Sequence, residues 1–336
     1  MNFRAVILCL LTAFGVWPAQ AIVLNGHDYR SLAGWAIEKH FGEVNDGRGD
    51  RFTLTNRAAQ RLAFEKNSTI AEINGVKVAL AFPVALDQTG VFLIARFDLA
   101  KTIEPLVTPP PLSPQKISTI CLDPGHGGKD TGFRVGKFYI RNEKTYTLAL
   151  ALELRDQLKK AGFNVVLTRD QDVFPKLAER PEIARRRGAD LFVSLHFNAF
   201  PADPAAVQGP ETYCITPVGA ASSNSEGVGA DHGSCPANRI ESKSLLLAYQ
   251  VHRALVRNLG ATDRSVRRAR FEVLREATMP AILIEGGYLS HPVEGKKIFD
   301  ANYRKQMAAA IVRGLVAYQK LTTLPPAENK PLSKKK

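Results

Sequence analysis

The sequence predicts an α/β domain over residues 117–322, with a mostly parallel sheet flanked by helices, preceded by a small α+β domain over residues 22–103. Three observations support this prediction. Strand and helix patterns alternate in the second part of the chain, short strand patterns fill the first part, and a proline-rich stretch separates them. The 336 residues suffice for two domains. Hydrophobic residues at 45% and charged residues at 23% exclude disordered, collagenous and coiled-coil proteins.

Residues 1–21 are typical of a secretory signal peptide. Arg4 supplies the early positive charge, residues 5–17 are mostly apolar, and residues 19–21 (Ala-Gln-Ala) offer a small-x-small cleavage site. The apolar run is too short to span a bilayer, which takes about 20 residues. We therefore expect a mature protein without a transmembrane segment, exported to the periplasm, the cell envelope or the extracellular medium.

The domain expected over residues 22–103 combines one helix pattern, Tyr29–Phe41, with short strand patterns. Ile70–Ile73 and Val76–Leu80 are joined at Asn74-Gly75, which predicts a hairpin, and Val91–Ile94 predicts another strand. This part weakly resembles the N-terminal domain of copper amine oxidases. No cluster of metal ligands or acid–base pairs stands out in it, so we interpret it as a binding or positioning module.

Two stretches are expected to lie outside the packed domains. Residues 104–116 contain five prolines, which predicts a semi-rigid extended linker. Residues 323–336 are polar and end in three lysines, which predicts a basic disordered tail.

Residues 117–322 contain alternating strand and helix patterns, as in units that build a parallel sheet. The strands are expected at Ile117–Leu122, Asn164–Thr168, Leu191–Leu195, Glu211–Ile215, Glu272–Leu274 and Ala281–Ile284. The helices are expected at Glu143–Ala161, Lys176–Arg187, Ser242–Leu259 and Tyr303–Gln319.

Polar residues follow three of these strands where they end. His126 lies in a glycine-rich turn after the first, and His196 and Glu285 follow two others. Ligands bind beyond the carboxyl ends of strands in open α/β sheets, so these side chains are expected at one site. Glu143, which begins a long helix, is a fourth candidate. Two His and one Glu leave zinc an open position, as in catalytic sites, and the second Glu would handle protons.

Each of these residues also has a structural interpretation when it is considered alone. The glycine-rich segment could form only a turn, His196 could be a bonded core histidine, and Glu143 could be a helix-start acid favoured by the helix dipole. A carboxylate directly after a buried strand, as at Glu285, is harder to explain in this way, because an isolated buried carboxylate is costly.

Residues 117–320 resemble the zinc-dependent N-acetylmuramoyl-L-alanine amidases of bacterial cell walls. The resemblance rests on blocks in the order of that family, at residues 122–130, 143–144, 167–169, 189–199 and 280–290. It implies one zinc ion bound by His126, Glu143 and His196, with Glu285 as the catalytic carboxylate. It also implies peptidoglycan as substrate, cut between N-acetylmuramic acid and L-alanine.

Some relatives carry a helix that blocks the zinc site until a partner removes it, so an activator protein is a candidate partner. The corresponding segment here, 216–234, has a composition poor for a helix, which favours a loop or substrate-binding flap. His232 within it could reach the metal, but a solvated loop histidine is the favoured interpretation. Residues 263–266 resemble a family segment near the substrate cleft, with Ser265 where glycine is commoner, which makes Arg264 a candidate substrate contact.

Cys214 and Cys235 flank this small polar segment, and an oxidising compartment permits a disulfide, so the pair is a disulfide candidate. Cys121 lies in an apolar strand and is interpreted as an ordinary buried residue.

The formal net charge of +13 indicates an anionic partner. The signal peptide argues against nucleic acid and favours an anionic wall polymer. Two alternatives to the amidase stay open. One is a zinc hydrolase of another wall amide bond. The other is a non-catalytic peptidoglycan-binding protein on an amidase scaffold, although retention of all four expected site residues argues against it.

Overall fold

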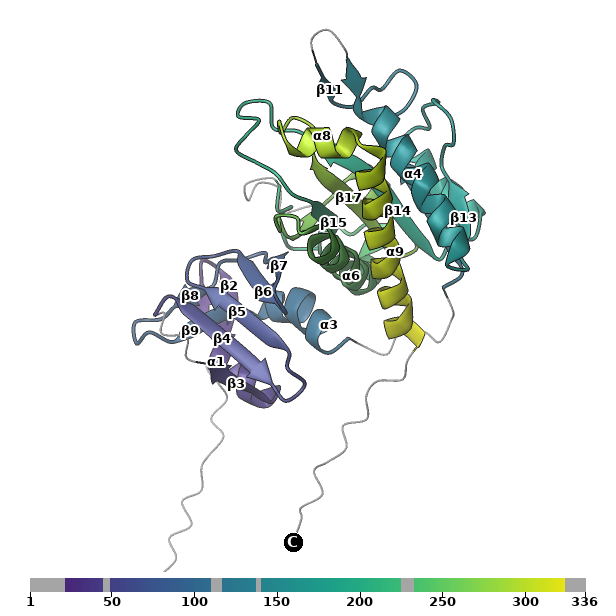
Figure 1. Ribbon diagram of the computed structural model, residues 1–336. Coiled ribbons are helices and arrows are strands. Elements are labelled where there is room, and N and C mark those ends of the chain that lie inside the picture. Colours follow the sequence, from purple (N-terminus) through teal and green to yellow (C-terminus); the bar gives the residue numbers. More distant parts are fainter. Residues whose placement is uncertain (1–21, 45–48, 110–116, 137–139, 225–232, 324–336) are drawn as a thin grey trace, which may run out of the picture.

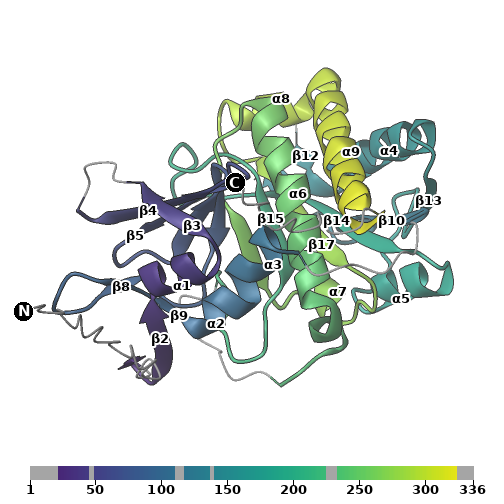
Figure 2. The same ribbon diagram turned by 90° about the horizontal axis from the view of Figure 1, so that it is seen from below.

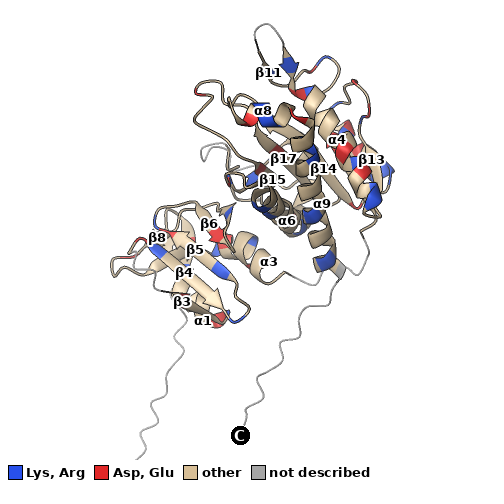
Figure 3. Ribbon diagram, in the orientation of Figure 1, with Lys and Arg blue, Asp and Glu red and all other residues tan. Residues whose placement is uncertain are grey.

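The computed structural model describes residues 22–44, 49–109, 117–136, 140–224 and 233–323. The expected signal peptide and nearly all of the expected tail lie outside these residues. In the described chain an N-terminal unit and a larger C-terminal unit lie side by side (Figure 1). Among the described helices, none is both long and apolar enough to cross a membrane. Lys and Arg occur on many elements of both units (Figure 3).

The C-terminal unit contributes six strands to one extended sheet, in the spatial order β13–β10–β14–β17–β15–β16. β14 pairs in parallel with β10 and β17, β13 pairs in parallel with β10, and β16 pairs in parallel with β15. β15 runs antiparallel to β17. The predicted mostly parallel sheet is therefore confirmed. The strands span β10 (Thr119–Pro124), β13 (Asn164–Leu167), β14 (Leu191–Asn198), β15 (Glu211–Ile215), β16 (Val266–Ala269) and β17 (Ala281–Tyr288).

Helices cover both faces of this sheet, because alternate residues of each buried strand point to opposite sides. Ile120 and Leu122 of β10 pack into a core with the long helices α4 (Glu143–Lys160), α6 (Glu241–Leu259) and α9 (Ala301–Thr323). Cys121 faces the other core, to which α5 (Glu179–Arg186) and α7 (Glu272–Arg275) contribute. Figure 2 shows α5 and α7 on the side of the sheet away from α6 and α9. The remaining elements of this unit are β11 (Arg134–Val135), β12 (Arg141–Asn142), the 3₁₀-helix η2 (Pro236–Ile240) and α8 (Glu294–Phe299).

Two element predictions are wrong. The strand expected at Glu272–Leu274 is the short helix α7, and the strand that pairs with β15 is instead β16. A short apolar run fits a buried strand and a buried helical turn equally well. In the N-terminal unit the helix is shorter than Tyr29–Phe41, because α1 covers only Leu32–Glu38 and begins where the Ser31 side chain accepts a hydrogen bond from Gly34 N.

The N-terminal unit joins five strands to the extended sheet as an antiparallel meander, in the order β7–β6–β5–β4–β3. The predicted hairpin is confirmed: Asn74 and Gly75 connect β6 to β7 with positive φ angles of 50° and 75°. A second sheet has the order β1–β2–β9–β8. The strands are β1 (Ile22–Leu24), β2 (His27–Ser31), β3 (Phe41–Val44), β4 (Arg51–Asn56), β5 (Arg61–Glu65), β6 (Ile70–Ile73), β7 (Val76–Ala79), β8 (Ala85–Leu86) and β9 (Phe92–Ala95).

A helical stretch follows β9, made of α2 (Arg96–Asp98), the π-helix η1 (Leu99–Ile103) and α3 (Glu104–Val107). The expected extended linker therefore begins with a buried helical turn, since Pro105, Leu106 and Val107 are packed. Residues 110–116 of the expected linker lie outside the described residues.

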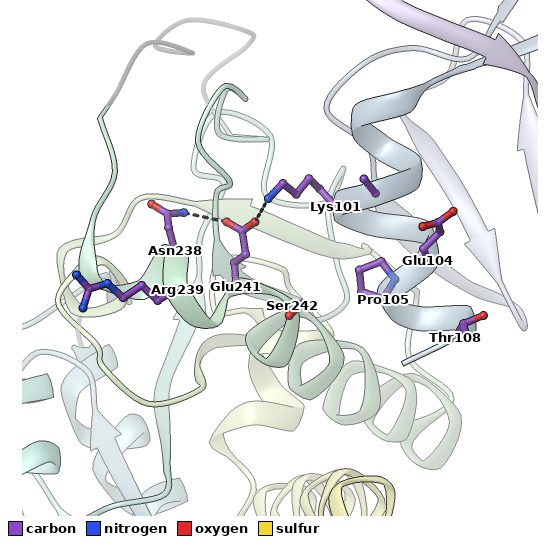
Figure 4. Close-up of a pocket in the computed structure, with 9 residues that line it drawn as sticks. Lys101, Glu104, Pro105, Thr108, Asn238, Arg239, Glu241 and Ser242 are labelled. Carbon is purple, nitrogen blue, oxygen red and sulfur yellow. Dashed lines mark hydrogen bonds and ion pairs between the residues drawn. The ribbon is translucent and has the colours of Figure 1, made fainter. Parts of the chain in front are cut away.

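The two units are joined directly through packed elements. β7 pairs in parallel with β16 at Val78 and Val266, which makes the sheet continuous. The Tyr249 hydroxyl donates to the Ile73 carbonyl oxygen at 2.9 Å. Lys101 of η1 pairs with Glu241 of α6 at 2.7 Å, beside a polar hollow of about 470 Å³ between the two units (Figure 4). The N-terminal unit is therefore packed onto the C-terminal unit.

The expected Cys214–Cys235 disulfide is wrong, because Cys121, Cys214 and Cys235 are all free thiols. Cys214 belongs to the core on the α4–α6–α9 face of the sheet, whereas Cys235 packs against the core on the α5–α7 face. The sheet therefore separates the two thiols. Cys121 is buried, as predicted.

Candidate active site

A row of polar side chains crosses three neighbouring strands on one face of the sheet. His196 of β14 is in register with Glu285 of β17, and Glu285 is in register with Glu211 of β15. Residues paired in this way point to the same side of the sheet, about 5 Å apart at their Cα atoms. The row therefore places a histidine and two carboxyl groups side by side.

His126 reaches the His196 end of this row from the turn after β10. Its φ of 61° lies in the left-handed region, which orients the side chain in a way that a regular strand would not. The Arg180 side chain holds this turn in place, because it donates a hydrogen bond to the His126 carbonyl oxygen at 2.9 Å. Gly125 is required beside it, since a Cβ there would overlap the His196 ring. The glycines of this turn therefore permit the close approach of two imidazoles.

Glu143 completes a cluster with the two histidines. It is the first residue of α4 and is 5% exposed. Its Oε1 lies 3.0 Å from His126 Nε2 and 3.1 Å from His196 Nδ1, and the two ring nitrogens are 3.2 Å apart. Backbone N–H groups of Phe197 and Phe133 donate to its two oxygens. The carboxylate is thus fixed by the main chain with one oxygen facing both imidazoles.

The arrangement of these three donor atoms fits a bound metal ion. Ligand atoms around tetrahedral zinc, at 2.0–2.1 Å from the ion, lie roughly 3.3 Å from one another, close to the separations observed. Asp130 Oδ2 lies 2.9 Å from His126 Nδ1, so it accepts the Nδ1 proton and leaves the Nε2 lone pair of the neutral ring for a cation. Two nitrogens and one carboxylate oxygen form a donor set that zinc prefers.

The electrostatics of the cluster also favour a cation. Burial lowers the pKa of His126, but its contacts with Glu143 and Asp130 outweigh burial, so the pKa is raised from its ordinary value. Burial raises the pKa of Glu143, but its contacts with both histidines outweigh burial and bring the pKa well below its usual range. The carboxylate therefore stays ionised inside the protein. A bound cation, or a proton on one of the two imidazoles, must balance its charge.

Glu285 lies next to this cluster in a different electrostatic state. Burial first, and then the nearby carboxylates of Glu143 and Glu211, raise its pKa well above the ordinary value. Its Oε2 atom is buried and has no hydrogen-bond partner within the described residues. A carboxyl group with a raised pKa and an oxygen free of hydrogen bonds is suited to take up and release a proton.

Glu211 at the other end of the row is a buried carboxylate, 1% exposed, that accepts four hydrogen bonds. The donors are Tyr213 Oη at 2.8 Å, Arg264 Nε at 3.0 Å, and Asn198 Nδ2 and Tyr288 Oη at 3.1 Å. Burial and the charge of Glu211 raise the pKa of Tyr288 to about 12, so its phenol keeps its proton and donates. Glu211 thereby holds Arg264 next to the residue that is in register with Glu285.

A buried network below the row fixes the end of β10. Asp123 accepts hydrogen bonds from Thr168 Oγ1 at 2.6 Å, Ser194 Oγ at 2.7 Å and Arg180 Nη1 at 2.9 Å. Asp123 and Arg180 are 0% and 1% exposed. A buried ion pair with its hydrogen bonds satisfied gives the His126 turn a single arrangement.

The structure thus brings together His126, Glu143, His196 and Glu285, and it places Arg264 at the other end of the same row. His232 lies outside the described residues. Ser265 adopts a φ of 79°, which explains why glycine would suit that position.

Sequence reasoning missed three carboxylates of the site, which are Asp123, Asp130 and Glu211. A signal existed for two of them. Asp130 lies four residues after His126, and Asp123 directly follows the apolar strand pattern. Glu211 looked like an ordinary strand start.

Comparison with known proteins adds independent findings. The family model described as "N-acetylmuramoyl-L-alanine amidase" matches residues 120–317. The chain is 34% identical over 221 residues to the N-acetylmuramoyl-L-alanine amidase AmiC of Neisseria meningitidis, covering 59% of this chain and 52% of the relative. It is 34% identical over 200 residues to the amidase LytC of Bacillus subtilis, covering 60% of this chain and 35% of the relative. The matches thus span about half of the first relative and about a third of the second.

Solved structures give the same picture for the C-terminal unit. The crystal structure of an N-acetylmuramoyl-L-alanine amidase from Clostridium difficile superposes with a TM-score of 0.51 at 33% identity. The superposition covers 61% of this chain and 98% of that protein. The matched region therefore corresponds to a nearly complete relative.

Proposed function

Because this chain belongs to the N-acetylmuramoyl-L-alanine amidase family, we propose that it hydrolyses the amide bond between N-acetylmuramic acid and L-alanine in peptidoglycan. The observation that carries the proposal is the His126–Glu143–His196 cluster, with Glu285 in register beside it. A buried carboxyl group next to a metal-ligand set is the combination that amide hydrolysis needs.

His126, Glu143 and His196 would hold one zinc ion. Bound there, zinc supplies Lewis-acid chemistry that polarises an amide carbonyl and makes water a nucleophile near neutral pH. The protein contributes the arrangement of the ligands. Asp130 fixes the protonated nitrogen of His126, and the backbone N–H groups of Phe133 and Phe197 hold the two Glu143 oxygens.

Glu285 would move the protons. Its unpartnered Oε2 accepts a proton from the attacking water, and the same carboxyl then delivers a proton to the departing amine nitrogen of L-alanine. The amine leaves as a neutral group with the proton that Glu285 delivers, and the lactyl carbonyl becomes a carboxylic acid, which releases the second proton of the water to solvent. Arg264, beside Glu211, would contact the substrate on the opposite side of Glu285 from the histidines.

We further propose that the protein acts outside the cytoplasm. The signal-peptide pattern of residues 1–21 supports export, and the net charge of +13 suits a substrate with an anionic wall around it. In this setting the enzyme would remodel the cell wall or separate daughter cells. An activator protein remains a candidate partner.

The test is digestion of purified peptidoglycan by the zinc-loaded mature protein, with the products identified by mass spectrometry and Glu285→Ala as the matched control. We expect free stem peptides that begin at L-alanine and glycan without peptides, both absent with the control. Cleavage at a different amide bond would support a zinc hydrolase of another wall bond. Binding without cleavage, even after an envelope extract is added as a source of activator, would support the non-catalytic alternative.

A further inference from the structure

We propose that Arg264 and Arg267 form a subsite for a carboxylate of the stem peptide, at the opposite end of the side-chain row from the metal-ligand cluster. The inference rests on the proposed amidase function and concerns which stem peptides the enzyme prefers. It assigns a role in substrate specificity to Arg267, which lies on β16. It also identifies the substrate group that Arg264 would contact as a carboxylate.

The two guanidinium groups converge on one carboxylate oxygen. Arg264 Nε lies 3.0 Å and Arg267 Nη1 lies 3.7 Å from Glu211 Oε1. Arg264 also lies over the Tyr288 ring, with its Cζ 5.4 Å from the ring centroid. A guanidinium carries five N–H donors, so Glu211 engages only a small part of the donor capacity of this pair. A second anion can therefore bind to the same two side chains.

Both arginines remain partly open to solvent although they sit beside a buried carboxylate. Their side chains are 30% and 25% exposed. Within the part of the chain that the structure describes, Arg267 Nε is buried without a hydrogen-bond partner, as is the neighbouring Ser265 Oγ. Arg267 therefore has donor capacity that the described protein does not use. A carboxylate bound at the solvent-exposed part of the two arginine side chains would supply acceptors, because planar guanidinium groups favour such anions.

The position of the pair matches the reach of a short peptide. His196, Glu285 and Glu211 are in register on three adjacent strands, and β16 is the next strand after β15. At about 4.8 Å per strand, β16 lies roughly 14 Å from the metal-ligand strand. An extended peptide advances at most about 3.3–3.6 Å per residue. A peptide bound along the row, starting at the scissile amide, would bring its third or fourth residue to the arginines.

A carboxylate of the stem peptide is the occupant that this geometry favours. The peptide leaves the scissile bond as its amine portion, and a short peptide with a free C-terminus carries at least one carboxylate. The uncharged sugar hydroxyls of the glycan would not use two guanidinium groups in this way. The subsite should therefore discriminate between stem peptides with free carboxylates and those in which the same groups are amidated.

The experiment compares two synthetic N-acetylmuramoyl tripeptides that begin with L-alanine and differ only in whether the peptide carboxylates are free or amidated. Values of kcat and KM are measured for the zinc-loaded wild-type protein, for Arg264→Gln and for Arg267→Gln. We expect the wild type to prefer the free carboxylates by about 10-fold or more, the size expected for charge-assisted hydrogen bonds. Each variant should lose most of this preference because its KM for the tripeptide with free carboxylates rises, while kcat changes little.

Arg186→Gln is the matched control. Arg186 lies on α5 with a 71% exposed side chain, and its substitution removes the same charge as the two test variants. It should keep the wild-type preference. Calorimetric binding of both tripeptides in a Glu285→Ala background provides a readout that does not depend on turnover, and zinc content shows that each variant remains folded at the metal end.

Three results would overturn the proposal. One is a wild-type protein that does not prefer the tripeptide with free carboxylates, a result that can be obtained without any variant. Another is a variant that loses activity equally on both substrates, as a purely structural role predicts. The third is an unchanged preference in both arginine variants. Failure of the zinc-loaded wild type to hydrolyse either tripeptide would instead contradict the amidase function, so the two failures are distinguishable.

Discussion

The two ends of the side-chain row are built in different ways. At the metal end, backbone N–H groups hold Glu143, the Arg180 and Asp130 side chains hold His126, and glycines permit the close packing of these residues. At the arginine end, Arg264 and Arg267 are held by side chains, above all by Glu211. The residues of the metal end are each fixed by several contacts, which gives the geometry that metal chemistry requires, whereas the two arginines keep donors for a ligand.

The N-terminal unit is connected to the arginine end. The Lys77 N–H of β7 donates to Asp263 Oδ2 at 2.9 Å, and Asp263 directly precedes Arg264. Asp263 Oδ1 also accepts from Ser265 N at 2.8 Å and lies 3.0 Å from His252 Nε2. Asp263 therefore couples the position of the N-terminal unit to the segment that carries Arg264. The difference between the two ends predicts that substitutions at each end change different quantities.

The larger expected effect comes from a residue that supports the metal end. Asp130→Ala removes the acceptor that fixes the Nδ1 proton of His126, so His126 Nε2 is no longer held ready as a ligand. We expect zinc affinity to fall by about 10- to 100-fold, the usual cost of losing such a partner. The measurement is zinc titration against a competing chelator.

Asp156→Ala, on the exposed side of α4 where Asp156 pairs with Arg155, serves as the control and should bind zinc like the wild type. The preference of the Asp130→Ala protein for free carboxylates, measured at saturating zinc, should be unchanged. Wild-type zinc affinity in Asp130→Ala would show that the histidine orientation does not depend on this hydrogen bond.

The smaller expected effect concerns the connection to the N-terminal unit. Asp263→Asn replaces one carboxylate oxygen by an NH2 group, so the side chain can no longer serve both Lys77 N and His252 Nε2 as an acceptor. Loss of about one hydrogen bond corresponds to roughly a 2- to 10-fold change, which we expect as a rise in KM without loss of zinc. Steady-state kinetics together with metal analysis measure both quantities.

Asp87→Asn, which lies in a turn of the N-terminal unit and accepts from Thr89, is the control and should leave KM unchanged. A loss of zinc in Asp263→Asn would mean that the two ends of the row are not separate. An unchanged KM would mean that the contact with Lys77 does not position Arg264.

The metal end was predictable from the sequence because it obeys a local rule. His126, His196 and Glu285 each follow an apolar strand, and parallel strands place their carboxyl ends at one edge. Glu143 was predictable as the start of a helix. Its position against His126 and His196 depends on how α4 packs beside β10, which only the fold provides.

The arginine end was not predictable in the same way. Glu211 faces Glu285 only because β15 runs antiparallel to β17, and strand alternation does not reveal that direction. β16 itself was missed, because the short segment Val266–Ala269 contains two arginines and lacks a clear apolar pattern. The continuation of the sheet into the N-terminal unit through β7 likewise depends on contacts between segments far apart in sequence. The resemblance of residues 22–103 to the copper amine oxidase N-terminal domain, and the domain boundaries themselves, stay predictions.

The most direct test of this account is a parallel measurement of zinc content and peptidoglycan hydrolysis after chelation and return of zinc. The wild type, His196→Ala and Glu285→Ala are compared. The account predicts one zinc ion per chain and stem-peptide release in the wild type, bound zinc without release in Glu285→Ala, and loss of both in His196→Ala. Wild-type hydrolysis by Glu285→Ala, or wild-type zinc affinity in His196→Ala, would contradict it.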